Sequence, residues 1–155
     1  MFEFLNRHSI LYGNDPATDN QQKIRGQRVF CCDRGLRRGC GATFSIFLAD
    51  VLPRHTFTAA LLWKLLCQML TADSIRAAAD SAGLSFGMET VYHLLARLRT
   101  RLDAVRSRLC LRLRAPASSQ VEPLLQTVEH LKAVFSNKPC SIAEFQLSFL
   151  HPFMG

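Results

Sequence analysis

The strongest hydrophobic pattern of the chain lies in residues 57–70, which read FTAALLWKLLCQML. Lys64 and Gln68 are the main polar positions of this stretch, so it has no polar side wide enough to face water. A helix that is apolar almost all round is stable only when other elements cover it. We therefore predict a buried helix here, beginning after the break that Pro53 makes in the chain.

Two more helices are predicted directly after this one. Asp73 is a natural N-cap for the segment SIRAAADSAG, and Gly83 is placed to end that short helix in the left-handed conformation. The next helix is predicted to begin near Met88 and to run to about Leu113, because apolar residues recur in it at alternating spacings of three and four. They are Met88, Val91, Leu95, Leu98, Leu102, Val105 and Leu109. An Ala-rich helix, a Gly turn and a longer basic helix are typical of a helix-turn-helix, although an ordinary helical hairpin has the same pattern.

The apolar seam of this third helix is flanked by arginines at the positions that face a second copy in a parallel coiled coil. Arg99 and Arg106 occupy one flank, and Arg101 and Arg108 occupy the other. Because like charges would meet repeatedly in such a dimer, we predict that the seam packs within its own chain, on residues 121–135.

Short β-prone runs precede the helices. Residues 28–32 (RVFCC) and 42–48 (ATFSIFL) are separated by a glycine-punctuated connection, which predicts a two-stranded hairpin. An isolated hairpin is only marginally stable in water, so we expect this one to pack on the helix of residues 57–70. Residues 13–22 (GNDPATDNQQ) carry turn-forming and polar residues without apolar periodicity, and we predict a loop there.

The C-terminal part of the chain is predicted to hold two helices. Residues 121–135 are amphipathic, and Pro123 suits the first helical position. Ser141 with Glu144 forms a capping box that opens a short helix, which Pro152 stops. Both apolar faces are expected to pack on the preceding helices, with docking of a partner protein as the alternative.

These elements predict a mainly α fold, in which a three-helix helix-turn-helix block carries a small N-terminal β-hairpin and two C-terminal helices. We divide the chain into residues 1–52, the loop and hairpin; residues 53–114, the helix-turn-helix block with its long basic third helix; and residues 115–155, the amphipathic helices. With 155 residues, of which 48% are hydrophobic, the chain is long enough to bury a core.

The formal net charge of +7 is concentrated in two short segments. Residues 97–114 contain seven arginines and one acid, Asp103, while residues 23–40 contain six basic residues and one acid, Asp33. Localised arginine of this kind is the electrostatic pattern expected for binding to a phosphate backbone. The N-terminus does not have the pattern of a secretory signal, and no apolar stretch is long enough to span a bilayer. The six cysteines are irregularly spaced and do not suggest a disulfide framework. We therefore expect a cytoplasmic protein that does not bind membranes.

The β-prone runs and the helices after them resemble a known family. Residues 5–112 are similar to the zinc-ribbon and helix-turn-helix N-terminal region of bacterial insertion-sequence transposases and of short transposase-like proteins. The ribbon of that family has the form Arg-x-aromatic-Cys and then Cys-Gly-x-Thr-Phe. The matching residues are Arg28, Phe30, Cys31, Cys40, Gly41, Thr43 and Phe44. The resemblance implies DNA binding.

Cys31 and Cys40 flank the hairpin connection as one half of a zinc ribbon does. Tetrahedral zinc takes four ligands, and the chain contains no Cys-x-x-Cys pair that would supply the other two. His8, Cys32 and His55 are the residues that can complete a site, but their spacing does not favour one. We predict a half-site without tightly held zinc, and no other cofactor.

The residues predicted to bind DNA lie mainly on the third helix. If that helix enters the major groove, Thr90 and Arg97 suit hydrogen bonds to bases, and Glu89 can accept one from a cytosine amine. The outward positions near its start are Glu89, Thr90, His93 and Arg97. Phosphate contacts are predicted for Arg99, Arg101, Arg106 and Arg108. A second contact is predicted for the hairpin arginines Arg34, Arg37 and Arg38.

No catalytic constellation stands out in the chain. The acids Glu122, Glu129 and Glu144 are explained by helix capping and solvation, and His93 has no cysteine at helical spacing. We therefore predict a non-enzymatic, transposase-like module that lacks a catalytic core, binds double-stranded DNA and has no small-molecule substrate. The alternatives are a helical interaction module for an acidic protein partner and an inactive remnant of a larger recombinase.

Overall fold

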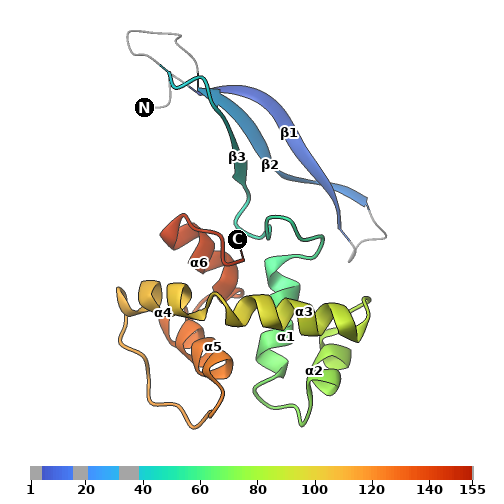
Figure 1. The fold of residues 1–155 in the computed structure, drawn as a ribbon, viewed down its shortest axis with the longest axis vertical. Coiled ribbons are helices and arrows are strands. Elements are labelled where there is room, and N and C mark those ends of the chain that lie inside the picture. Colours follow the sequence, from blue (N-terminus) through green and yellow to red (C-terminus); the bar gives the residue numbers. More distant parts are fainter. Residues whose placement is uncertain (1–4, 16–20, 32–38, 155) are drawn as a thin grey trace.

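The computed structural model describes residues 5–15, 21–31 and 39–154. These residues form six helices and one three-stranded antiparallel sheet. The sheet extends away from a block made of all the helices (Figure 1). The prediction of a mainly helical chain with a small N-terminal β part is therefore confirmed at this coarse level. No helix in the described ranges combines the length and the apolar character needed to cross a membrane.

The sheet is larger than the predicted hairpin. Its strands β1 (Leu5–Asp15), β2 (Gln21–Cys31) and β3 (Thr43–Phe47) lie in the order β1-β2-β3. The predicted loop over residues 13–22 is wrong at both of its ends, because Asp15 pairs with Gln21 and the ladder continues from there. When both faces of a two-stranded ribbon are open to water, its strands are held by backbone hydrogen bonds and need no alternation of apolar and polar residues. Polar strands of this kind leave little signal in a sequence.

Gly26 allows β2 and β3 to approach each other closely. A Cβ atom at this position would lie 2.1 Å from the carbonyl oxygen of Ile46, well inside van der Waals contact. Only glycine fits there without a shift of backbone.

The predicted second strand, residues 42–48, is confirmed as β3 with slightly shorter bounds.

Helix α1 (Ala59–Gln68) is the centre of the helical block. Thr58 caps it by accepting a hydrogen bond from the backbone N–H of Leu61 at 3.2 Å. Helices on three sides contact α1, namely α2, α5 and α6. Its buried residues are Ala59, Leu62, Trp63, Leu65 and Leu66. The prediction of a helix buried on nearly all sides is confirmed.

Helix α2 (Ile75–Ala82) begins one residue later than predicted, because Ser74 and not Asp73 is the N-cap and accepts from the N–H of Ala77 at 3.1 Å. Gly83 ends it with φ +74°, as predicted. The N–H groups of Gly83 and Leu84 bond back to the carbonyl oxygens of α2, which is the Schellman arrangement. The turn after α2 therefore has a defined geometry.

The predicted third helix is wrong as a single element, since it consists of α3 (Met88–Arg99) and α4 (Leu102–Cys110). The hydroxyl of Thr100 donates to the carbonyl oxygen of Arg97 at 2.8 Å, and the N–H of Arg101 bonds to Leu98, three residues back. A β-branched hydroxyl residue that bonds to the preceding turn bends or interrupts a helix. The break lets the two halves of the apolar seam pack against different neighbours.

Helices α5 (Pro123–Val134) and α6 (Ser141–Phe149) complete the block. Pro123 is the first residue of α5, as predicted, whereas α6 is capped by Cys140 rather than by Ser141. Helix α4 packs against α5, and both share one core with α1, so the prediction that the seam packs within its own chain is confirmed for α4. Residues 53–114 and 115–155 thus contribute to a single core.

The sheet is joined to the helices through side-chain hydrogen bonds and not, as predicted, by lying on α1 (Figure 1). The guanidinium group of Arg25 in β2 donates to the carbonyl oxygens of Leu52, at 3.2 Å, and of His55. Val51 forms an isolated bridge with Thr58 directly before α1. Most of the apolar side chains of β3 stay exposed as a result.

Gln146 of α6 connects the loop after β3 to the C-terminal residues. Its amide nitrogen donates to the carbonyl oxygens of Ala49 (2.7 Å) and Val51 (3.0 Å), and its oxygen accepts from the N–H of Phe153 at 3.0 Å. Only 9% of the residue is exposed, so water cannot easily replace these three bonds.

We expect Gln146→Ala to lower the free energy of unfolding by about 2 kcal/mol, because it leaves buried polar groups without partners. In a chain of this size that loss corresponds to a fall in Tm of about 4–8 °C. The control is Gln126→Ala, which removes one half-buried bond, to the carbonyl oxygen of Gln120, and should cost about 1 kcal/mol or less. Equal effects of both substitutions in thermal unfolding would contradict the role given to Gln146.

Candidate nucleic-acid interface

The outer face of α3 is polar and open to solvent. Glu89, Thr90, His93 and Arg97 are all exposed, as their spacing predicts. The opposite face is buried in the core through Val91, Leu94, Leu95 and Leu98. Within this face, Nε2 of His93 lies 3.6 Å from Oε1 of Glu89, one helical turn earlier. The face is therefore presented outward by a helix that its own core holds in place.

A chain of rings connects the turn before α3 with the loop before α1. Phe86, in the turn, lies 5.6 Å from Phe57, measured between ring centroids, and Phe57 lies 5.1 Å from His55. Phe57 is buried, and aromatic pairs at these distances add to the stabilisation from burial. The rings fix His55 relative to the turn from which α3 begins.

His55 has two arginines near it, each from a different element of the fold. Arg97 comes from α3, Arg25 from β2 and His55 from the loop between β3 and α1. Burial, followed by the positive charges of Arg97 and Arg25, lowers the pKa of His55 below its ordinary value of 6.5. The guanidinium group of Arg25 also donates a hydrogen bond to the His55 carbonyl oxygen, so these groups lie where the sheet meets the helical block. We call Arg25, His55 and Arg97 the basic corner.

Some of the arginines predicted to bind phosphate already have partners within the chain. Arg99 forms an ion pair with Glu122, its Nη2 and Nε lying 2.5 and 3.0 Å from Oε1. Arg108 donates to the carbonyl oxygen of Ala104 at 3.0 Å. Arg112 is not one of the predicted phosphate contacts, and its guanidinium group lies over the rings of Phe135 and Phe149. The charge of Arg99 is locally neutralised, whereas Arg108 and Arg112 keep their full charge at the surface.

The remaining predicted residues are placed less clearly. Arg101 and Arg106 are half-buried, and the Nε atom of Arg101 is enclosed without a hydrogen-bond partner among the described residues. The hairpin arginines Arg34, Arg37 and Arg38 lie outside the described residues.

Cys31 and Cys40 are brought together at the end of the sheet that lies away from the helices (Figure 1). The N–H of Cys40 donates to the sulfur of Cys31 at 3.3 Å, and the N–H of Gly41 donates to the Cys31 carbonyl oxygen at 3.0 Å. Gly41 has φ +66°, a conformation that favours glycine. Within the ranges that the structure describes, no group of three or more His, Cys, Asp or Glu residues is arranged to hold a metal ion.

Sequence reasoning did not assign Arg25 and His55 to the candidate site. Arg25 belongs to the basic segment of residues 23–40, which is the one signal that could have suggested it. His55 is 42 residues away from Arg97 in the chain, and no spacing rule connects the two. Their proximity comes from the tertiary structure alone. Comparisons of the chain with protein-family models, with curated proteins and with solved structures found no match.

We expect purified protein to contain no stoichiometric zinc, because Cys31 and Cys40 supply two of the four ligands that a tetrahedral site takes. The measurement is metal analysis by mass spectrometry after dialysis against a weak chelator. Near-stoichiometric zinc that disappears in Cys31→Ser, but persists in the control Cys110→Ser at another exposed cysteine, would overturn this prediction.

The lowered pKa of His55 predicts a dependence of stability on pH. The unfolded chain takes up a proton at His55 before the folded chain does, so this contribution to stability is full above about pH 6.5 and is lost as the pH falls below it. His55→Gln should therefore flatten the decline of the unfolding free energy with falling pH, as measured by urea denaturation at several pH values. The exposed His8 supplies a matched substitution, His8→Gln. A decline in His55→Gln as steep as in the wild type would contradict the assignment.

Proposed function

We propose that this chain is a DNA-binding module in which α2, the turn at Gly83 and α3 act as a helix-turn-helix. The single observation that carries the proposal is the outer face of α3, which is polar, uncovered and adjacent to the basic corner. In such motifs the second helix lies in the major groove, and basic residues around it contact the phosphates on either side. The Schellman turn after α2 supports this use, because its two hydrogen bonds set the direction in which the chain leaves α2.

The residues of α3 divide by their chemistry. Thr90 and Arg97 can donate hydrogen bonds to base edges, and Glu89 can accept one from cytosine. Arg25 adds positive charge on the sheet side of α3, although its guanidinium group already donates to the carbonyl oxygens of Leu52 and His55. Arg101, Arg106 and Arg108 continue the positive charge onto α4. Arg99 contributes less than its position suggests, because Glu122 neutralises it.

The proposed role is binding without catalytic chemistry, and it is transposase-like in the arrangement of the ribbon-like sheet before the helices. The alternative that the chain is an inactive remnant of a larger recombinase is compatible with DNA binding. The other alternative, a module for an acidic protein partner, would use the same arginines but would have no need of the polar outer face of α3.

Binding to a duplex of random sequence should weaken steeply as salt rises from about 50 to about 200 mM, with a slope of about 0.9 per phosphate contacted. Replacing Arg101 and Arg108 by Gln should reduce that slope by about two, if each contacts one phosphate. The control is Lys132→Gln with Lys138→Gln, which removes the same charge from the exposed surface of the C-terminal residues. Fluorescence anisotropy measures both. DNA binding that does not depend on salt concentration, or an equal reduction of the slope in the two double variants, would contradict the proposal.

A second experiment separates DNA from an acidic protein. Sequences selected by the wild type from a pool of random duplexes should show a preferred base that Arg97→Ala relaxes, at a cost of about 1–3 kcal/mol in discrimination. Polyglutamate of matched charge should compete only weakly. If polyglutamate displaces DNA completely at equal charge, and selection yields no preferred sequence, the acidic-partner alternative is favoured.

A further inference from the structure

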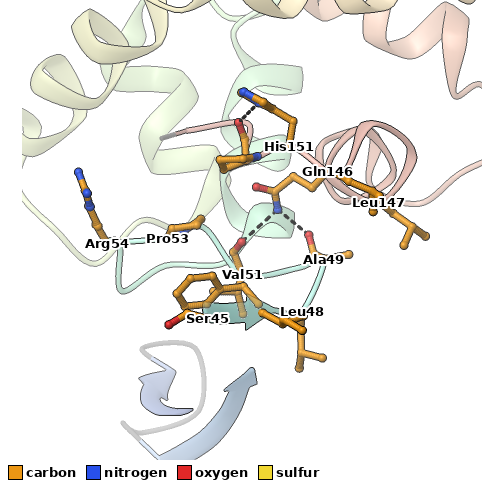
Figure 2. A pocket seen from close by; sticks show the side chains of 13 residues that line it. Ser45, Leu48, Ala49, Val51, Pro53, Arg54, Gln146, Leu147 and His151 are labelled. Carbon is orange, nitrogen blue, oxygen red and sulfur yellow. Dashed lines mark hydrogen bonds between the residues drawn. The ribbon is translucent and has the colours of Figure 1, made fainter. Parts of the chain in front are cut away.

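An apolar cleft of about 620 Å³ lies between the end of β3, the loop that follows it and the C-terminal part of α6. Figure 2 shows Ser45 and Leu48 on one side of this cleft and Gln146, Leu147 and His151 on the other. The cleft is separate from the outer face of α3 and from the basic corner, since neither contributes a residue to its lining. It has no part in the proposed DNA contact.

The cleft runs along the free edge of the sheet. Its lining includes the four consecutive residues 45–48, and successive side chains of a strand point to opposite faces, so a surface that touches all four follows the edge of the strand. β3 is the outer strand of the described sheet. The hydrogen bonds from Leu48 N–H to Arg25 and from Cys31 N–H to Ala42 set the pattern of the β2–β3 ladder. In that pattern Thr43, Ser45 and Phe47 direct their backbone N–H and C=O groups away from β2, toward the free edge.

Large apolar side chains surround this edge without covering it. Ile46, Phe47 and Leu48 on the sheet side are 41–48% exposed, while Leu147 and Leu150 on the helix side are 60% and 90% exposed. Contiguous apolar surface beside unpaired strand groups is the combination that accepts an added strand.

Two strained residues border the same cleft. Arg54 (φ +66°) and Leu150 (φ +47°) are the non-glycine residues in the left-handed region among those described, and both line it. Such conformations cost energy at residues with a side chain and cluster at sites that bind or move. Figure 2 shows Arg54 beyond Pro53 at one border of the cleft, with its exposed side chain directed away from Ser45 and Leu48.

The charge of the lining selects the kind of partner. Arg54 and His151 are its only ionisable side chains, and no carboxylate lies among the lining residues. We propose that β3 and this cleft bind an extended peptide strand of a partner protein, apolar at alternate positions and carrying an acidic residue that pairs with Arg54. The strand adds to the edge of β3 through backbone hydrogen bonds and places its apolar side chains against Leu147 and Leu150.

A second copy of this chain fits the cleft less well. Its β3 has the sequence TFSIF and brings no acid, so two-fold pairing of the two edges would leave Arg54 without a carboxylate from the opposite strand. Each copy also carries a net charge of +7, which opposes association. Self-association is therefore an outcome that the test must distinguish.

The probe is a fluorescent eight-residue peptide with valine at alternate positions and threonine and one aspartate between them. Replacing its aspartate by lysine should weaken binding about tenfold, the change expected for loss of a charge-assisted pair. Two further peptides carry backbone N-methyl groups on the odd or on the even residues. Because only one edge of a strand faces β3, one of these two peptides should lose binding and the other should keep it.

Three variants of the full chain test the site itself. Ser45→Pro removes an outward N–H without breaking a bond to β2, so it should abolish peptide binding. Leu150→Ser should weaken binding at least fivefold, while Leu111→Ser, at an 80% exposed leucine outside the cleft, should leave it unchanged. Arg54→Gly relieves the left-handed strain and should remove the preference for aspartate over lysine. If Ser45→Pro does not fold, the N-methylated peptides and the leucine pair decide the question.

Sedimentation of the wild type completes the test. A monomer that binds the aspartate peptide and responds to the variants as described supports the proposal. A concentration-dependent dimer that Leu150→Ser dissociates, together with absence of peptide binding, overturns it in favour of a second copy. A monomer that binds neither form of the peptide also overturns it. None of these measurements depends on DNA, so they stand whether or not the DNA-binding proposal holds.

Discussion

The burial of α1 is the constraint on which the rest of the helical block depends. A helix with apolar residues on almost every side cannot be stable with one neighbour, so α2, α5 and α6 must all contact it. Two of these three covering helices come from the last third of the chain. This explains why residues after Arg114 belong to the same core as the helices before it, and why α3 and α4 can each leave one face open to solvent.

The interruption at Thr100 gives the basic residues two different settings. Before it, α3 keeps its apolar side in the core and its polar side uncovered; after it, α4 packs against α5. The hydrogen bond of the Thr100 side chain to its own helix thereby separates the exposed polar face of α3 from the basic residues of α4. The ion pair between Arg99 and Glu122 lies at this junction and joins the end of α3 to the start of α5.

Much of the helical part could be predicted from the sequence, because apolar periodicity and Gly83 act locally. The apolar residues Ile10 and Leu11 suggest a short strand near the N-terminus, but the full length of β1 and its pairing with the polar first half of β2 could not be predicted, because the ribbon lacks regular apolar alternation. The break at Thr100 depends on a hydrogen bond from its hydroxyl to a carbonyl oxygen of the same helix, and the periodicity of apolar residues does not reveal such a contact. Of the candidate site, the outer face of α3 followed from spacing. The part played by Arg25 and His55 required contacts across 30 and 42 residues of chain, which only a three-dimensional structure supplies.

The way in which the sheet is attached has a mechanical consequence. The sheet is held to the helical block by polar contacts, because Arg25 donates to the carbonyl oxygens of Leu52 and His55 and Val51 forms a bridge with Thr58. A packed interface also resists rotation through the apolar area that turning exposes, whereas each hydrogen bond is worth about 1 kcal/mol net. We therefore expect the angle between the sheet and the helices to change more easily than an angle fixed by apolar packing. A ligand that touches both parts narrows the range of this angle to the value that suits its own shape. The bound ligand then determines the angle between the sheet and the helical block.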